Sequence, residues 1–212
     1  RLHVLHLTTA RELSFFTPGP LAGKRITVEA CIHHLFFSEE DYATRGSLIK
    51  CNPAIKTAKD REALVRAVME DRIDVIATDH APHTLEEKQG TYFKAPSGLP
   101  LVQHPLLMGM ELVRRKELDL HTLVRKTSHA VAELFGVKER GYIREGYFAD
   151  LVLIDDEAST LVRNEDALYK VGWTPLDGET LHGRIKATWV NGHLAWDGNT
   201  VSSPQGERLR FI

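Results

Sequence analysis

Three short apolar segments separated by helical patterns limit the folds open to this chain more than any other feature. They cover residues 2–5, 25–33 and 74–78. Helical patterns over residues 9–16 and 57–69 lie between them, the second with apolar residues at helical spacing. Alternation of strand and helix is typical of βαβ units, whose short buried strands run parallel. The sequence therefore predicts an α/β fold in this part of the chain.

The pattern changes after residue 140. A long loop over residues 80–104 leads to predicted helices over 105–116, 120–126 and 129–135. Beyond Gly141, strands are expected at 149–154 and 184–190, and Asn191-Gly192 is a strong hairpin signal. We expect two parts: residues 1–140 as the α/β part and residues 141–212 as a β-rich segment.

Composition excludes several classes of protein. The 212 residues carry a formal charge of -2 and are 42% hydrophobic, so neither disorder nor a nucleic-acid partner is expected. No apolar stretch approaches the roughly 18 to 20 residues that cross a bilayer, and no signal peptide is visible, which predicts a cytoplasmic protein without a membrane partner. Cys31 and Cys51 have no zinc or redox spacing and are expected to be buried thiols.

Polar residues with metal-ligand chemistry follow the three predicted strands. They are His6, the pair His33-His34, and Asp79. In parallel α/β folds, reactive groups gather at the carboxyl ends of strands. Imidazole and carboxylate ligands suit zinc or a similar divalent ion. These residues therefore predict a metal site at one edge of the sheet, although a single histidine taken alone is more often a structural residue than a ligand.

The segments around these residues resemble dihydroorotases of the amidohydrolase superfamily. Four segments carry the likeness, in the family's order and near its spacings: residues 3–10 (HVLHLTTA), His33-His34-Leu35, Asn52-Pro53, and residues 78–83 (TDHAPH) followed by 94–98 (KAPSG). Residues 146–155 and the hairpin at 191–192 are similar to the segment that follows the family's barrel. The likeness covers nearly the whole chain.

The resemblance implies a fold. It implies part of a (β/α)₈ TIM barrel, namely strands 6 to 8 with their helices, followed by an all-β segment of a small composite domain. The remaining amino-terminal part of the barrel would then lie before Arg1, as a partner of this segment, and we expect the whole protein to be a homo-oligomer, first of all a dimer.

The resemblance also implies a site and an activity. His6 and Asp79 correspond to metal ligands of a binuclear zinc (Zn2+) centre, and Asp79 also to the catalytic general base and acid. Four further positions correspond to substrate-binding residues: Asn52, His83, Ser97 and Gly98. The implied reaction is the reversible cyclisation of N-carbamoyl-L-aspartate, the small-molecule substrate, to L-dihydroorotate in pyrimidine biosynthesis.

The sequence departs from the family in one large respect. The family's first-strand His-x-His, its bridging residue and its substrate arginine have no counterpart here, and two protein ligands are fewer than the three of catalytic zinc. Three readings follow: a dihydroorotase that needs the missing barrel half, another cyclic amidohydrolase resembling dihydropyrimidinase or allantoinase, or a metal-free scaffold homologue. The sequence does not decide the oligomeric state, the metal bound or the identity of the missing ligands.

Overall fold

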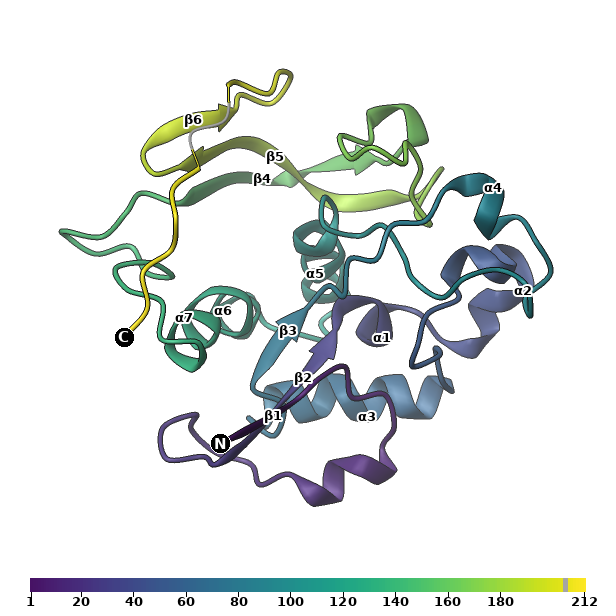
Figure 1. Cartoon of the computed structure of the whole chain (residues 1–212), viewed down its shortest axis with the longest axis horizontal. Coiled ribbons are helices and arrows are strands. Elements are labelled where there is room, and N and C mark those ends of the chain that lie inside the picture. The colour runs from purple at the N-terminus through teal and green to yellow at the C-terminus, as the bar shows by residue number, and fades with distance from the viewer. Residues whose placement is uncertain (204–205) are drawn as a thin grey trace.

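The computed structural model describes residues 1–203 and 206–212, and its elements form an α/β architecture (Figure 1). The strands are β1 (Leu2–Val4), β2 (Ile26–Cys31), β3 (Val75–Ala77), β4 (Leu151–Leu161), β5 (Thr180–Val190) and β6 (His193–Trp196). The α-helices are α1 (Ile32–Phe36), α2 (Tyr42–Arg45), α3 (Ala58–Met69), α4 (Leu85–Lys88), α5 (Pro105–Arg114), α6 (Leu120–Val124) and α7 (Ala130–Leu134). Short 3₁₀ turns cover Arg11–Phe15, Glu39–Asp41, Gly46–Ile49 and Asn164–Asp166, and a π-helical turn covers Arg125–His129.

The first sheet is parallel, as expected, and α-helices lie between β2 and β3, but the helix predicted over residues 9–16 is only the 3₁₀ turn Arg11–Phe15. Strand β2 lies in the middle, with β1 on one side and β3 on the other. The register pairs Leu2 with Ile26 and Glu29 with Val75, so the three strands end at a common edge. Val28 and Ala30 of β2 are fully buried. Helix α3 packs close by with Leu64 and Val68 in the same hydrophobic core.

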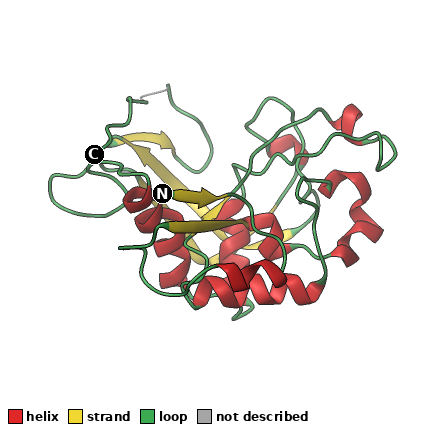
Figure 2. Ribbon diagram, turned by 60° about the horizontal axis from the view of Figure 1, so that its bottom comes forward, coloured by secondary structure: helices red, strands yellow, loops and turns green. Residues whose placement is uncertain are grey.

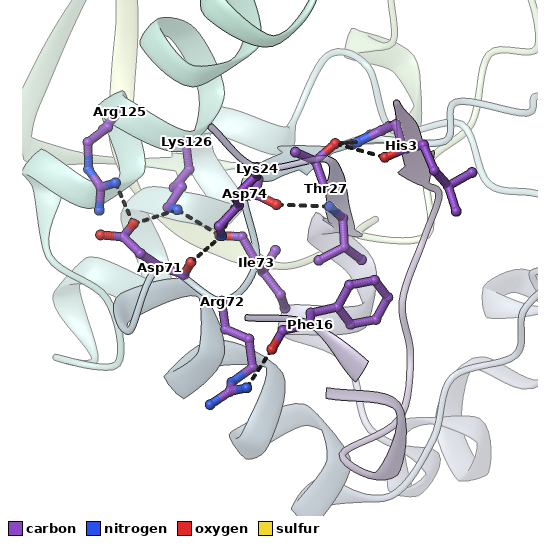
Figure 3. Close-up of polar contacts among 12 residues, drawn as sticks. His3, Phe16, Lys24, Thr27, Asp71, Arg72, Ile73, Asp74, Arg125 and Lys126 are labelled. Atoms are coloured by element: carbon purple, nitrogen blue, oxygen red, sulfur yellow. Dashed lines mark hydrogen bonds and ion pairs between the residues drawn. The ribbon is translucent and has the colours of Figure 1, made fainter. Parts of the chain in front are cut away.

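Polar contacts hold the opposite edge of this sheet, where the strands begin (Figure 3). The buried carboxylate of Asp74 accepts hydrogen bonds from Lys24 Nζ at 2.7 Å and from the backbone N–H of Val28 at 2.9 Å. The buried Lys126 ammonium donates to the carbonyl of Ile73 at 2.6 Å and pairs with Asp71. These contacts tie β2, β3 and the π-helical turn together at the amino ends of the strands.

The second sheet is antiparallel, with strand order β4-β5-β6. Helix α5 packs against β5, and the two sheets lie apart in the molecule (Figure 1). Glu111 on α5 links the two parts, because its buried carboxylate accepts from the backbone N–H of His182 on β5 at 3.3 Å and is held by Arg114 and Arg115. Figure 2 shows from a second direction that most helices gather on one side of the strands. None of the helices in the described residues is long and apolar enough to cross a membrane.

Four further details differ from the sequence prediction. Strand β2 ends at Cys31, so His33 lies in helix α1 and not on a strand. A short helix, α4, interrupts the predicted loop over 80–104. The predicted helices 120–126 and 129–135 are joined by the π-helical turn. Finally, β4 and β5 extend further than expected, to Leu161 and back to Thr180.

Candidate active site

His6 and Asp79 occupy equivalent positions at the carboxyl edge of the parallel sheet. His6 lies two residues after β1 and Asp79 two residues after β3. Both have positive φ angles, 40° and 45°, a conformation that costs energy for residues other than glycine. The backbone N–H of Leu7 donates to the carbonyl of Glu29 at 2.9 Å, which fixes the segment of His6 against β2. The two residues thus flank the end of the central strand.

Cys31 and His33 fill the space at the end of that central strand. Burial raises the pKa of the Cys31 thiol, and the carboxylates of Glu29 and Asp79 act in the same direction. Burial lowers the pKa of His33, and the imidazoles of His34 and His6 act in the same direction. Cys31 ends the strand that lies between β1 and β3, so the segments of His6 and Asp79 lie on either side of it.

Cys31, His33 and His34 form a second donor group in the same region. Their ligand atoms lie within 4.8 Å of one another, and all three side chains are buried. A backbone hydrogen bond with Thr78 raises the pKa of His33 against the effect of burial, and His34 Nε2 contacts the Pro53 carbonyl at 2.9 Å. Burial lowers the pKa of His34 to about 4, so its ring is neutral near pH 7. The thiols of Cys31 and Cys51 are free and buried, as the sequence predicted.

His3, by contrast, has ordinary structural partners. Its ring nitrogens contact Thr27 Oγ1 at 2.9 Å and Glu29 Oε2 at 3.0 Å, both on β2 (Figure 3). Its ring also packs edge-on against Phe135. His3 therefore joins β1 to β2, as expected for a packing residue.

Three of the four predicted substrate residues lie in one hydrogen-bonded group. His83 Nε2 lies 3.1 Å from the carbonyl oxygen of Ser97, and Gly98 follows directly. The backbone N–H of Gly98 donates to the carbonyl of Lys50 at 2.9 Å, which brings in the segment of the fourth residue, Asn52. Asn52 itself is exposed and is joined to Pro53 by a cis peptide bond.

Glycine is the only residue type that fits at position 98 without rearrangement of its neighbours. Its φ is +140°, and a Cβ atom there would lie 2.5 Å from the carbonyl oxygen of Ala81 and 2.7 Å from the Ala81 Cβ. The glycine thus lets the two loops at this edge approach each other closely.

The donor chemistry at this edge fits a zinc centre in part. His6 supplies an imidazole and Asp79 a carboxylate, both ordinary zinc ligands. Catalytic zinc has three protein ligands and an open position, so these two residues would need further ligands. His6 and Asp79 are therefore the residues that would hold the metal.

Sequence reasoning missed two residues that shape the site. Lys88, fully buried at the end of α4, donates to three backbone carbonyls, including that of Gly98. The buried Trp173 donates from Nε1 to the carbonyl of His83 at 2.8 Å. The spacing of Thr84 and Glu87, which form a capping box, was the available signal for helix α4.

Comparison with known proteins gives consistent results. The model of the "Amidohydrolase family" matches residues 105–195. A dihydroorotase of Halobacterium salinarum is 36% identical over 210 residues, 99% of this chain and 48% of the relative. A dihydroorotase of Lactiplantibacillus plantarum is 36% identical over 199 residues, 93% of this chain and 46% of the relative. The chain thus spans about half the length of these curated relatives.

Solved structures extend the comparison to the fold. An L-hydantoinase (dihydropyrimidinase) from Arthrobacter aurescens superposes with a TM-score of 0.88 at 25% identity, over 96% of this chain and 46% of that structure. Sequence and structural similarity therefore agree on one superfamily across nearly the whole chain. The chain is similar to the amidohydrolase family over residues 105–195, and the curated relatives that it matches over nearly its whole length are dihydroorotases.

Proposed function

We propose that the protein containing this chain is a dihydroorotase, which reversibly cyclises N-carbamoyl-L-aspartate to L-dihydroorotate. The observation that carries the proposal is the placement of His6 and Asp79, each two residues after a strand that flanks β2, at the carboxyl edge of a parallel sheet. Dihydroorotases that match 93–99% of the chain support the choice of substrate.

In this proposal Asp79 moves the proton. Zinc held by His6 and Asp79 would supply a polarised amide carbonyl and water of lowered pKa. The carboxylate of Asp79 accepts a proton from the attacking water and returns it to the departing ring nitrogen in the hydrolytic direction. A positioned acid or base of this kind contributes a factor of about 10² to 10⁴ in rate.

The remaining four residues bind the substrate in this proposal. Asn52 contacts the pyrimidine ring and His83 the carboxylate group. Ser97 and Gly98 contact the substrate through their backbone, so the Ser97 side chain should matter little. Holding the substrate in this way makes attack on the carbonyl effectively intramolecular.

A hydantoinase or dihydropyrimidinase is the second candidate, because the structural neighbour from Arthrobacter aurescens carries those names. The substrates separate the two. Dihydroorotate carries a carboxylate that dihydrouracil and hydantoin lack, and a site built around His83 should favour it. We expect the full-length protein to hydrolyse dihydroorotate with a kcat/KM at least about 10²-fold above that for dihydrouracil. The reverse preference would replace dihydroorotase by the second candidate.

Several finer features are part of the same proposal. The parallel strands would be strands 6 to 8 of a (β/α)₈ barrel, residues 1–140 would be the carboxyl-terminal part of that barrel, and residues 141–212 would belong to the small domain. The metal would be a zinc pair, the missing barrel half would complete its ligands, and the whole protein would be a cytoplasmic homodimer. Zinc analysis of protein purified without chelator tests the metal, and its absence would favour the scaffold homologue.

A further inference from the structure

Lys88 is a buried cation that is bound by carbonyl groups. The side chain is fully buried at the end of α4. Its Nζ donates to the carbonyls of Lys50 at 2.8 Å, Pro96 at 3.0 Å and Gly98 at 2.9 Å. The ammonium group has three protons, and three acceptors are present. Among the described residues, no carboxylate forms an ion pair with it, so its partners are peptide dipoles.

The three carbonyls belong to the two segments assigned to substrate binding. Lys50 lies two residues before Asn52, while Pro96 and Gly98 flank Ser97. The carbonyl of Lys50 also accepts the backbone N–H of Gly98. One ammonium group therefore bridges the segment of Asn52 and the segment of Ser97 and Gly98. Its hydrogen bonds go to the backbone of these segments and not to the proposed metal ligands.

Other contacts hold Lys88 and its loop in place. Ser47 Oγ donates to the carbonyl of Lys88 at 2.5 Å. The ammonium of Lys50 binds the carbonyls of Tyr92 and Ala95, at 2.6 and 2.7 Å, so the loop is attached again further along. Two lysines thus connect the loop over 90–98 to the segment that leads into Asn52.

A charge at this place costs stability, which argues for a specific role. Burial lowers the pKa of Lys88 to about 8, which reflects the cost of removing the ammonium group from water. An apolar side chain of similar volume would pack there without that cost. It could not, however, hold three carbonyls from two segments at a common point.

We infer that Lys88 is a positioning residue for substrate binding, which fixes the distance between the segment of Asn52 and the segment of Ser97 and Gly98. The inference rests on the proposed function for the identity of the substrate. Lys88 does not contact the proposed metal ligands. Its loss should therefore weaken substrate binding more than it slows the chemical step.

The test compares Lys88→Met with Lys126→Met in the full-length protein. Lys126 is the matched control, because it is also a buried lysine that donates to a backbone carbonyl, but it lies at the amino ends of the strands. For Lys88→Met we expect the KM for dihydroorotate to rise about tenfold or more with kcat within about threefold of the wild type. For Lys126→Met we expect lower stability and an unchanged KM.

Hydrogen exchange supplies a readout that does not depend on activity. In Lys88→Met, exchange should increase at residues 50–52 and 97–99, including the Gly98 amide, while the β2 amides stay protected. If the wild type does not act on dihydroorotate, the proposed function fails, and the exchange result still decides the role of Lys88. If Lys88→Met does not fold, Lys88→Gln, which keeps two donors, should show the same changes at smaller size.

Three results would overturn the inference. The first is a folded Lys88 variant with unchanged KM. The second is unchanged exchange at residues 50–52 and 97–99 in that variant. The third is an equal rise of KM in Lys126→Met, which would show that general destabilisation, and not the bridge between the two segments, changes substrate binding.

Discussion

Asp79 has a left-handed backbone conformation, and this makes stability and activity separable at the proposed catalytic residue. Its φ is 45°, in a region where a residue with a Cβ atom costs about 1 to 2 kcal/mol. Asparagine and aspartate tolerate this region better than other such residues, and glycine has no steric cost there. We therefore consider the series Asp79→Asn, Asp79→Gly and Asp79→Ala in the full-length protein.

The expected stabilities follow from these terms. Glycine avoids the cost of about 1 to 2 kcal/mol but loses roughly 0.5 to 1 kcal/mol through its more flexible unfolded chain. Asp79→Gly should thus be more stable than Asp79→Ala by about 0.5 to 1 kcal/mol. Asp79→Asn should lie close to the wild type in stability. All three variants lack the carboxylate, so each should lose at least a factor of about 10² in kcat.

Urea unfolding and dihydroorotate hydrolysis measure the two effects. Lys116 is the matched control, because it is exposed, has φ of 60° and lies far along the chain from the site residues. Lys116→Gly should change stability in the same direction as Asp79→Gly relative to alanine, with full activity. The reasoning is refuted if Asp79→Asn keeps more than about a tenth of the wild-type kcat, or if Asp79→Ala is as stable as Asp79→Gly.

Three further predictions concern other parts of the molecule. Arg114, and after it Arg115, lowers the pKa of Glu111 from its ordinary value of 4.5 to about 2. The stability that this carboxylate contributes is present above pH 4.5, and it should fall by up to about 3 kcal/mol as the pH drops to 2. Glu111→Gln should flatten this pH dependence of urea unfolding. Asp74→Ala leaves the buried N–H of Val28 without its acceptor and the half-buried Lys24 with only the Asp71 carbonyl, and should cost about 1 to 3 kcal/mol of unfolding free energy, with kcat per folded molecule unchanged. Gly98→Ala brings its Cβ within 2.5 Å of the Ala81 carbonyl and should raise KM, whereas Gly146→Ala, with open space around it, should not.

Clear outcomes would contradict each of them. For Glu111, it is the same fall in unfolding free energy with decreasing pH in the wild type and in Glu111→Gln. For Asp74, it is a fall in kcat in Asp74→Ala that is larger than the loss of folded protein explains. For Gly98, it is a KM equal to that of Gly146→Ala.

The sequence was sufficient for the parallel strands because their signal is local. Each strand is a short apolar run, and its polar successor lies at the carboxyl edge once the strands are parallel, which places His6 and Asp79. His33 was assigned to a strand because alternation continues through Ile32, but the chain turns into α1 at that residue. Two residues of continued alternation do not distinguish a strand from the first turn of a helix.

Long-range contacts account for what the sequence did not predict. The ammonium of Lys88 binds carbonyls that are 8 to 38 residues away, and backbone acceptors leave no trace in residue type. The length of β4 beyond Ile154 depends on pairing with β5 across a bulge, while its own residues there are mostly polar. Local patterns carry no information on either contact.

Anomalous diffraction at the zinc edge from crystals of the full-length protein, grown with zinc and without chelator, tests the central claim most directly. We predict zinc peaks within about 2.0 to 2.2 Å of an imidazole nitrogen of His6 and a carboxylate oxygen of Asp79. Peaks that contact neither residue, or zinc bound instead by Cys31, His33 and His34, would contradict it.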